Sequence, residues 1–599
     1  MNNMNHALLS GNEAVARGAF EAGCRFATGY PGTPSTEILE SITNYKDIYA
    51  NWAVNEKVAL ESASGASIAG ARSIVTMKHV GLNVASDPFM TLAYTGVGAG
   101  LVIVSADDPG IFSSQNEQDN RWYALFAKVP MLEPSDSDEA RVFTKKAFQI
   151  SEMFDLPVLL RLTTRISHSK SIVKIEDPDQ VRETVYPKKQ IEKYVMVPSN
   201  ARGRRLLLEE RFKKLTEFSE GFELNRTEWK NKDIGIITSG ISYQYVKESM
   251  PDASILKLAL TNPLPFNMID DFVKRVRKVL IVEELDPYIE MQIRYISTKI
   301  HGKEFVSSIS EFTPLKVKNG IDRFLGKPVN AAKPPVMDVS QRPPILCPGC
   351  PHRGLFYQLY KLRVFVAGDI GCYTLAFDQP LNAVHTCLDM GAGISQAMGI
   401  ERVMPSGSEK PVAVIGDSTF LHSGITSLLN AVYNRSNILV IILDNRTTAM
   451  TGAQPNPVAG MDIYGNPAPE VSLEKLVSAI GAEWVKTVDP YDTKLTEKTL
   501  KDALSYRGTA VVITKGPCVL LPGYKEKKQK PYIVKTEMCT GCTICLNINC
   551  PSVWWESTEK KLPGRKRARG IAYIDPLTCT GCGLCADICS FDAIVKVEE

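Results

Sequence analysis

Short, almost wholly apolar runs recur along the first third of the chain, and each is followed by a stretch with helical periodicity. The clearest are ARSIVTMKHV, from residue 71, and GAGLVIVSADD, from residue 98, which ends in a polar turn. Continuous apolar runs of this length are typical of strands buried on both faces. Their alternation with helices is typical of a parallel sheet, so the pattern predicts a first α/β domain over residues 1–190.

The same alternation predicts a second α/β domain over residues 191–330. A charged stretch and helical material near residues 203–220 come first, and DIGIITSG, SILKLAL and KVLIVEEL then predict strands. The segment GKPVNAAKPPVMDVSQRPP follows, and its content of Pro and small residues predicts a linker.

A third α/β domain is predicted over residues 345–524, where PVAVIGDS and NILVIILDN are the clearest strands. The sequence HSGITSLLNAVYN between them has the periodicity of a crossover helix. The run KEKKQK then leads into a C-terminal segment over residues 530–599.

Composition limits the protein class. The 599 residues suffice for several domains, and 44% hydrophobic and 23% charged residues are ordinary for a globular protein. A net charge of +3 argues neither for nor against nucleic acid, and the N-terminus lacks the basic and apolar regions of a signal peptide. The longest uncharged run, Pro88 to Ala106, predicts a buried helix, turn and strand rather than a membrane span. We expect a cytoplasmic protein without a nucleic-acid or membrane partner.

The last 61 residues hold eight cysteines in two matching blocks, offset by 40 residues. The blocks read Cys539-x2-Cys542-x2-Cys545-x4-Cys550-Pro551 and Cys579-x2-Cys582-x2-Cys585-x3-Cys589. In such blocks three thiolates bind one iron–sulfur cubane and the fourth cysteine ligates the other. The spacing therefore predicts one [4Fe-4S] cluster on Cys539, Cys542, Cys545 and Cys589, and a second on Cys550, Cys579, Cys582 and Cys585.

Zinc sites and disulfides are the alternatives for these cysteines. Zinc needs four ligands per site and does not call for interleaved blocks of this kind. Fourteen cysteines without an export signal indicate a reducing compartment. Because oxygen destroys exposed low-potential clusters, we expect an anaerobic or oxygen-poor setting.

Polar residues follow both strands of the third domain. Gly416-Asp417-Ser418 ends one strand, and 26 residues separate Ser418 from Asn445 at the end of the next. The carboxyl ends of parallel strands form ligand sites, and carboxylate and amide oxygens suit a magnesium ion that carries a diphosphate. Amides at the helix start after Asp417 would contact phosphate oxygens. The alternative is a pair of ordinary turns, because Gly-Asp and Asp-Asn are common there.

This spacing resembles the thiamine diphosphate (TPP) motif, and the following TTAMTGAQPNP strengthens the resemblance. The resemblance implies that Asp417, Asn445 and the backbone carbonyl of Thr447 bind magnesium. Ser418 stands where the motif usually has a third glycine. The other residues assigned to cofactor binding are Gly416, Ser418 and Gly391.

Enzymes of this type also use a glutamate from a separate pyrimidine-binding domain to activate the cofactor. VNEKVALESASGASIAGA contains Glu56, followed nine residues later by Gly65-Ala66, a spacing similar to that of 2-oxoacid:ferredoxin oxidoreductases. Glu61 is a rival on the same helical stretch, and a surface helical glutamate is the alternative for either. TGYPGTPST resembles the Y-P-x-T-P-S loop of that family, which places Thr33 near cofactor and substrate.

Further segments extend the resemblance over essentially the whole chain: GNEAVARG, NEKVALE, TMKHVGLNVASDP, SSQNEQDNR and CPGCPHRG. The sequence is similar to the catalytic alpha subunits of the indolepyruvate ferredoxin oxidoreductase family, whose first cysteine block also has the longer final spacing. The implied fold class is α/β, with three successive parallel-sheet domains, two of them TPP-binding, and a small ferredoxin-like α+β domain. The implied order is pyrimidine domain (1–190), transketolase C-terminal-like connecting domain (191–330), pyrophosphate domain (345–524) and two-cluster ferredoxin-like domain (530–599).

The resemblance implies oxidative decarboxylation of an arylpyruvate such as indolepyruvate, with TPP as electron sink. Coenzyme A would receive the acyl group, and the clusters would pass electrons to ferredoxin. A separate beta subunit is implied, with two alpha chains meeting in a larger assembly. Two alternatives remain: a non-redox TPP decarboxylase or lyase with a structural cluster domain, and an electron-transfer subunit with a degenerate TPP fold.

Four further cysteines, Cys347, Cys350, Cys372 and Cys518, resemble the ligands of a cluster near TPP in related pyruvate enzymes. They imply a possible third cluster, and buried apolar thiols are the alternative. Cys24 and Cys387 are expected in the core.

Two histidines and one basic loop complete the predictions. His352 and His79 are candidates for ordering the substrate carboxylate or relaying protons, with a structural hydrogen-bonded histidine as the alternative. The basic loop 560–570, with Arg565, Lys566 and Arg567, is either a solvated loop or a docking surface for an acidic ferredoxin.

Overall fold

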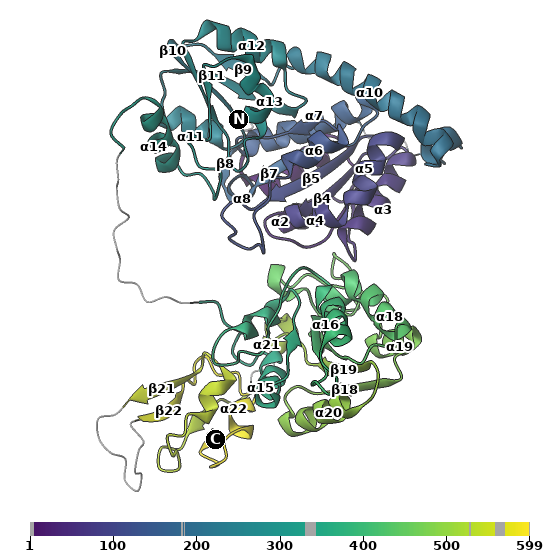
Figure 1. Ribbon diagram of the computed structural model, residues 1–599, viewed down its shortest axis with the longest axis vertical. Helices are drawn as coiled ribbons and strands as arrows, with labels where there is room; N and C mark the ends of the chain where they lie inside the picture. The colour runs from purple at the N-terminus through teal and green to yellow at the C-terminus, as the bar shows by residue number, and fades with distance from the viewer. Residues whose placement is uncertain are drawn as a thin grey trace. The chain divides into compact units, whose positions relative to one another are not determined.

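The protein is described by a computed structural model. It describes residues 5–180, 184, 186–329, 343–525, 529–557 and 570–597, and the chain divides into two compact units, Met1–Val336 and Met337–Glu599 (Figure 1). Most of the predicted linker and nearly all of the basic loop 560–570 lie outside the described residues.

The first unit is built on a seven-stranded sheet in the order β12-β6-β7-β5-β4-β2-β3. Its neighbouring strands are parallel except β12, which is antiparallel to β6. Every residue of β4, β5 and β7 is buried, which explains their continuous apolar sequences. The strands are β2 (Phe26–Gly29), β3 (Tyr49–Trp52), β4 (Ser73–Lys78), β5 (Leu101–Asp107), β6 (Met131–Leu132), β7 (Val158–Thr163) and β12 (Leu260–Asn262).

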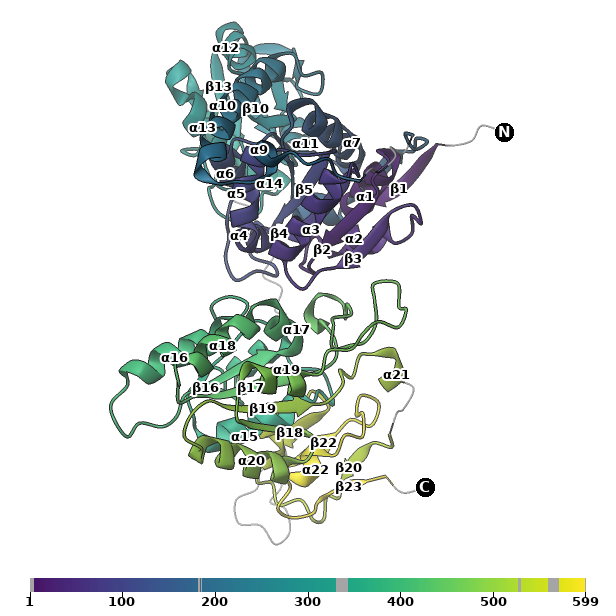
Figure 2. The ribbon, with the colours of Figure 1, turned by 90° about the vertical axis from the view of Figure 1, so that its right-hand side faces the viewer.

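Helices and one small antiparallel pair surround this sheet (Figure 2). The uncharged run Pro88 to Ala106 forms most of α5, a turn at Gly96 and most of β5, as predicted. The elements are β1 (His6–Ser10), β8 (Lys170–Lys174), α1 (Gly11–Glu21), α2 (Thr36–Ile42), α3 (Glu56–Ile68), α4 (His79–Val84), α5 (Ser86–Thr95), α6 (Arg121–Ala127), α7 (Ser137–Phe154) and α8 (Thr164–His168). Among the described residues, no helix is both long and apolar enough to cross a membrane.

A second sheet of the first unit has the order β14-β13-β10-β11-β9, with only β9 antiparallel. Its strands are β9 (Arg226–Glu228), β10 (Asn231–Ser239), β11 (Ala253–Leu258), β13 (Lys278–Val282) and β14 (Ile300–His301). Its helices are α9 (Ile191–Tyr194), α10 (Pro198–Glu220), α11 (Ser242–Ser249), α12 (Phe266–Arg275), α13 (Tyr288–Ile293) and α14 (Pro314–Phe324).

Contacts across residue 190 join the two sheets into one unit. Strand β12 lies in the second stretch of sequence but completes the first sheet. Buried Arg121 donates to Glu283 at 2.6 Å, and buried Lys257 pairs with Glu139. Such pairs keep their charges satisfied away from water. The boundaries predicted at residues 190, 330, 345 and 524 stay predictions.

The second unit contains an all-parallel five-stranded sheet in the order β15-β16-β17-β19-β18. Alternate residues of one strand fill two separate cores: Val440 lies in one, and Leu439 and Ile441 lie in the other. The strands are β15 (Val366–Ala367), β16 (Val412–Gly416), β17 (Leu439–Asp444), β18 (Trp484–Val488) and β19 (Ala510–Lys515).

Helices cover both faces of this sheet. Helices α15 (His352–Leu362) and α20 (Thr493–Ser505) pack on one core, and α16 (Ala392–Val403), α18 (Ile425–Tyr433) and α19 (Leu473–Ile480) pack on the other. The predicted strands PVAVIGDS and NILVIILDN and the crossover helix between them are confirmed. Two shorter helices are α17 (Asp417–Thr419) and α21 (Pro522–Lys525).

The C-terminal segment is a small α+β structure with two antiparallel strand pairs, β20-β23 and β21-β22. Its Ile548, Leu584 and Ile588 share a core with Leu355 and Phe356 of α15. The expected fold class is therefore confirmed, and the C-terminal part belongs to the same unit as the third sheet. Its elements are β20 (Tyr532–Val534), β21 (Val553–Ser557), β22 (Gly570–Ile574), β23 (Ile594–Lys596) and α22 (Leu584–Asp587).

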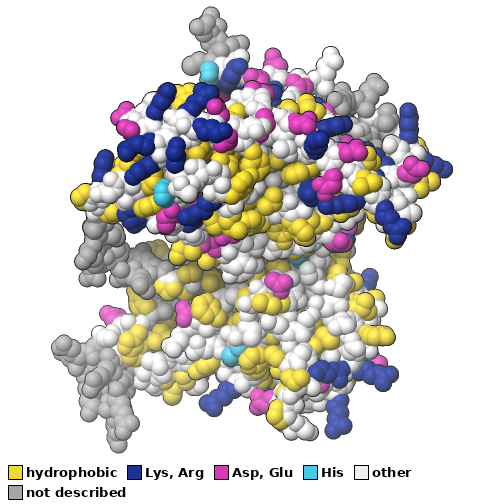
Figure 3. Space-filling view, turned by 45° about the horizontal axis from the view of Figure 1, so that its top comes forward, with side chains coloured by type: hydrophobic (Ala, Val, Ile, Leu, Met, Phe, Trp, Pro, Cys, Tyr) yellow, Lys and Arg dark blue, Asp and Glu magenta, His cyan; other side chains and the backbone are white. Residues whose placement is uncertain are grey.

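The face of the molecule in Figure 3 mixes side chains of both charge signs among apolar ones, without a large region of a single sign.

Candidate cofactor and cluster sites

Asp417 and Asn445 reach the same edge of the sheet in the second unit. Asp417 follows β16 and Asn445 follows β17, and these two strands are parallel neighbours. Both side chains are buried, with 2% and 8% of their surface exposed. The structure therefore brings together the two side chains that the sequence assigns to magnesium.

The Asp417 carboxylate is short of positive charge. Its oxygens accept N–H groups from Ser418 at 2.6 Å and Arg446 at 2.8 Å. Burial, and then the nearby Asp444 carboxylate, nevertheless raise its pKa to about 7. Asp444 Oδ1 is buried without a hydrogen-bond partner among the described residues. A cation fits this environment because it would stabilise both carboxylates.

Side-chain hydrogen bonds shape the loop that follows Asn445. Asn445 Oδ1 accepts the Thr447 N–H at 3.1 Å, and the buried Thr447 hydroxyl donates to the Gln454 carbonyl at 3.1 Å. The Ser418 hydroxyl bonds that of Thr448 at 2.8 Å. Ser418, the departure from the usual glycine, thus joins the ends of two strands through its own side chain.

Gly391 precedes α16 with a φ of +98°, and a Cβ there would lie 2.5 Å from the Ser423 Cβ, so only glycine fits. Its N–H donates to both carboxylate oxygens of Asp369, at 2.8 and 3.0 Å, and Gly393 adds a third N–H at 3.0 Å. Burial raises the pKa of Asp369 to about 6. The Gly391 N–H is thus engaged within the protein. Sequence reasoning missed Asp369, which follows too short a strand to stand out.

In the first unit, Glu56 is the first residue of α3. The Asn55 side chain caps this helix by accepting the Val58 N–H at 2.9 Å. Glu56 is 6% exposed, whereas the Glu61 side chain is 47% exposed and pairs with Lys57 on the helix surface. A Cβ at Gly81 would lie 2.6 Å from Glu56 Oε1, so Gly81 leaves the space that this carboxylate occupies.

Thr33 and His79 lie on loops and helices at the carboxyl ends of β2 and β4. Thr33 is half-buried, and its carbonyl accepts the Ser113 hydroxyl at 3.5 Å. Burial, and then the charge of Lys78, lower the pKa of His79 to about 4, and its Nε2 lies 3.2 Å from Asn116 Oδ1. Burial also lowers the pKa of Lys78 to about 8. Sequence reasoning missed Lys78, although it ends the apolar run beside His79.

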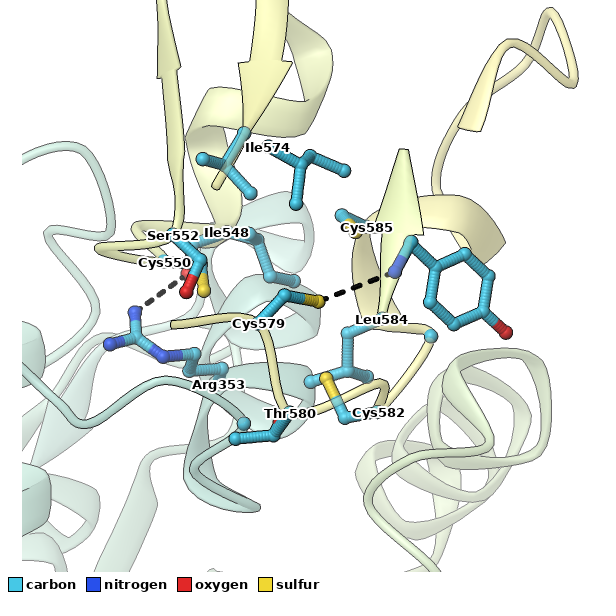
Figure 4. Close-up of a pocket in the computed structure, with 14 residues that line it drawn as sticks. Arg353, Ile548, Cys550, Ser552, Ile574, Cys579, Thr580, Cys582, Leu584 and Cys585 are labelled. Carbon is cyan, nitrogen blue, oxygen red and sulfur yellow. Dashed lines mark hydrogen bonds between the residues drawn. The ribbon is translucent and has the colours of Figure 1, made fainter. Parts of the chain in front are cut away.

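The eight C-terminal cysteines line two separate cavities. One is lined by the four cysteines assigned to the second cluster: Cys550, Cys579, Cys582 and Cys585 (Figure 4). The other is lined by the four assigned to the first: Cys539, Cys542, Cys545 and Cys589. Each cavity thus draws three cysteines from one block and one from the other, in the interleaved pattern of paired cubanes.

The cavity walls favour an anionic group with sulfur atoms. The Tyr532 N–H points at Cys579 Sγ at 3.5 Å. The hydroxyl of Thr540, which lines the cavity of the first cluster, is buried without a hydrogen-bond partner among the described residues. Burial, and then neighbouring thiols, raise the pKa of Cys545 to about 11, so a cationic iron centre would be needed to hold it as thiolate.

The four cysteines of the possible third cluster are linked by electrostatic interactions. Burial, and then the thiols of Cys518 and Cys347, raise the pKa of Cys372 to about 11. Burial raises that of Cys350 to about 12, with contributions from Cys372 and Cys347. Their arrangement as the ligands of one cluster stays a prediction.

His352 begins α15 directly after this cysteine pair and is 5% exposed. Burial lowers its pKa to about 4, so its ring is neutral near pH 7. The ring meets the edge of Tyr373, whose hydroxyl accepts the Gly416 N–H at 3.0 Å. His352 is thus linked through Tyr373 to the strand end that carries Asp417.

The two remaining cysteines, Cys24 and Cys387, differ in their exposure to solvent. Cys24 is buried, as predicted, and burial raises its pKa to about 12. The prediction for Cys387 is wrong, because this residue is exposed. It lies on the loop before α16, where its thiol points to the Asp369 carbonyl at 3.7 Å.

Three family models match the chain. They are "Thiamine pyrophosphate enzyme, C-terminal TPP binding domain" over residues 369–514, "Pyruvate flavodoxin/ferredoxin oxidoreductase, thiamine diP-bdg" over 17–216, and "4Fe-4S dicluster domain" over 527–593. Together they define a TPP-dependent 2-oxoacid:ferredoxin oxidoreductase that carries [4Fe-4S] clusters.

Curated relatives extend this match over nearly the whole chain. Indolepyruvate oxidoreductase subunit IorA of Pyrococcus horikoshii is 42% identical over 99% of this chain and 97% of its own length. The subunit from Methanothermobacter thermautotrophicus is 40% identical over 98% and 96%. A solved 2-oxoglutarate:ferredoxin oxidoreductase from Magnetococcus marinus is 17% identical over 54% of this chain and 66% of its own, with a TM-score of 0.44. The chain belongs to the family of indolepyruvate oxidoreductase subunits IorA, which confirms the resemblance inferred from its sequence.

Proposed function

We propose that this chain is the catalytic subunit of an enzyme that oxidatively decarboxylates arylpyruvates such as indolepyruvate. Coenzyme A would take the acyl group as a thioester, carbon dioxide would leave, and ferredoxin would receive the electrons. The relatives named for indolepyruvate support this substrate class.

One observation carries the redox function. Gly349 and Arg353, from the segment that enters the TPP-binding sheet of the second unit, line the same cavity as Cys550 and Cys582. The cluster site therefore adjoins the pyrophosphate domain and shares its hydrophobic core. A structural cluster domain would not require this proximity, whereas electron transfer does. The arrangement favours the oxidoreductase over a non-redox lyase.

The residues have separate roles in the proposed reaction. When bound, TPP supplies the electron sink for decarboxylation. Asp417, Asn445 and the Thr447 carbonyl would hold magnesium, because the buried Asp417 carboxylate needs a cation. Glu56, buried at the start of α3, would exchange a proton with the aminopyrimidine.

Two further residues are proposed to act on the substrate. The Thr33 hydroxyl would position the 2-oxoacid, since this loop follows β2 at the edge of the sheet that carries Glu56. His352 would act as a neutral hydrogen-bonding group, because burial lowers its pKa to about 4.

We also propose a third [4Fe-4S] cluster on Cys347, Cys350, Cys372 and Cys518. The mutual effect of these thiols on their pKa values supports it. Gly349, between the first two, lines the cavity of Cys550, so a third cluster would adjoin the second.

The assembly and setting follow from the family. We propose a separate beta subunit, pairing of alpha chains in a larger assembly, and an anaerobic cytoplasm. Docking of ferredoxin on the basic loop 560–570 stays a prediction, because Arg565, Lys566 and Arg567 lie outside the described residues.

The test uses the anaerobically purified complex with its beta subunit. Carbon dioxide release and viologen reduction are measured together with indolepyruvate, pyruvate and 2-oxoglutarate. We expect indolepyruvate to be preferred and about two viologens to be reduced per carbon dioxide, because the substrate loses one electron pair. Carbon dioxide release without reduction would favour the lyase. About eight irons per chain would indicate two clusters, and about twelve would indicate the third.

A further inference from the structure

The two cluster cavities have the same kind of ligands but differ in charge. The cavity of Cys550, Cys579, Cys582 and Cys585 is lined by one charged side chain, Arg353 (Figure 4). The residues that line the cavity of Cys539, Cys542, Cys545 and Cys589 are apolar or uncharged. Ligand chemistry alone would therefore make the two clusters alike, and Arg353 distinguishes them.

Arg353 is 1% exposed and is held by backbone carbonyls on both sides. Its Nε donates to the Cys347 carbonyl at 3.0 Å, and its Nη1 donates to the Ile548 carbonyl at 3.1 Å. Further N–H groups bond the carbonyls of Leu346 and Asn549. The guanidinium thus joins the Cys347–Cys350 loop to the first cysteine block in one fixed geometry.

The Arg353 charge has no carboxylate partner among the described residues. Burial lowers the pKa of Arg353, and nearby thiols, first that of Cys550, act in the opposite direction. A buried cation without a counter-ion is costly, so an anionic group is expected at this place. A cubane with four thiolate ligands is such a group, and its negative charge grows by one on reduction.

We propose that Arg353 is a positioning residue for electron transfer, whose buried charge holds the cluster of Cys550, Cys579, Cys582 and Cys585 at a higher reduction potential than its neighbour. When bound, this cluster would accept one electron derived from the 2-oxoacid and pass from [4Fe-4S]2+ to [4Fe-4S]+. No bond would be made or broken and no proton would move. This inference rests on the cluster ligands of the proposed function.

The test is an anaerobic redox titration of the whole complex, followed by electron paramagnetic resonance, on wild type and Arg353→Gln. We expect the equilibrium constant for reduction of the higher-potential C-terminal cluster to fall at least tenfold, which is about 59 mV for one electron. The lower potential should stay unchanged. Unchanged potentials, equal shifts in both, or a shift of only the lower one would each overturn the inference.

Two further variants separate charge from structure. Arg353→Lys keeps the positive charge but loses the planar guanidinium. In this variant the reduction potential of the higher-potential cluster should stay near the wild-type value, while the thermal stability of the protein falls as in Arg353→Gln. Arg363→Gln removes an exposed charge just past the other end of α15 and should move neither potential. If Arg353→Gln does not retain both clusters, a fall of at least tenfold in Arg353→Lys would overturn the inference.

The outcome is distinct from a failure of the proposed function. A wild-type complex without two C-terminal cluster signals would contradict the cluster ligands themselves. Two cluster signals whose reduction potentials are the same in wild type and in the Arg353 variants would contradict only the role of this residue.

Discussion

The carboxyl edges of the two main parallel sheets differ in their buried charged groups. In the second unit this edge carries acids, and burial raises the pKa of Asp417 to about 7 and of Asp369 to about 6. In the first unit burial lowers the pKa of Lys78 to about 8 and of His79 to about 4, and it raises the pKa of Asp107 to about 6. The same architecture thus produces one edge with buried acids and one edge with buried bases and acids together.

The difference shows how burial acts on acids and on bases. Burial disfavours any charged form, so the acids of one edge and the bases of the other both move toward neutrality. A bound cation would stabilise the ionised form of Asp417, which matches the magnesium of the proposed function. Lys78 already interacts with the nearby Asp108 carboxylate. Four changes test this comparison.

The largest effect is expected from Glu56→Gln. Loss of the proton-transferring carboxylate should lower kcat by roughly 10²–10⁴-fold, while the fold is kept because the amide is isosteric. Steady-state viologen reduction by the complex measures this. Glu61→Gln, which alters an exposed acid on the same helix, should change kcat less than about twofold. Full activity in Glu56→Gln would revive the interpretation as an electron-transfer subunit.

Asp417→Asn should weaken magnesium–TPP binding by roughly 100-fold, because one metal ligand loses its charge. Calorimetric titration measures this affinity. Without cofactor, the same variant should melt at a higher temperature than wild type at pH 8, because an ionised carboxylate with a raised pKa destabilises the fold. Asp502→Asn, on the exposed side of α20, serves as the control for both measurements. Unchanged affinity would exclude Asp417 as a ligand.

Gly81→Ala displaces Glu56 without changing it. Because the new Cβ would lie 2.6 Å from Glu56 Oε1, the carboxylate must move, and we expect roughly a tenfold to hundredfold loss of kcat. Gly65→Ala is the matched control on α3, where nothing lies within 4 Å of the added Cβ. It should retain activity and gain up to about 1 kcal/mol of stability. Equal effects of the two substitutions would argue against a precise role for Glu56.

The smallest effect concerns pH. His79 has a folded pKa of about 4 against 6.5 when exposed, so the unfolded chain binds more protons between these values. Its contribution to stability is complete above pH 6.5 and is lost as the pH falls toward 4, by at most about 3 kcal/mol. Apparent melting temperatures of wild type and His79→Gln measure this, with a smaller acid-induced fall expected in the variant. Parallel curves for the two proteins would show that His79 is not the group responsible.

Much of the fold could be predicted because local patterns persist in the structure. The apolar runs that form β4, β5, β16 and β17 are buried on both faces, so consecutive apolar residues in the sequence predict their burial. Other features depend on partners far along the chain. Strand β12 completes a sheet whose other strands end about 100 residues earlier, and no feature of the nearby sequence predicts this pairing.

The candidate sites show the same division. The cysteine blocks carry their ligand sets in their spacing, because a tight loop can bind one cubane only at certain intervals. Asp369, Lys78 and Arg353 carry no such signal, since each acquires its role from groups brought near by folding. The exposure of Cys387 was predicted wrongly for the same reason.

The sequence by itself therefore determined the class of protein, through its resemblance to a known family. Periodicity predicted the order of the sheets and spacing predicted which cysteines belong together, because both are local properties of the chain. Only the tertiary structure decided which of Glu56 and Glu61 is buried, which acids lose their charge and which cluster cavity contains a cation. Burial and electrostatic interaction depend on distances in space, and neighbouring residues in the sequence do not determine them.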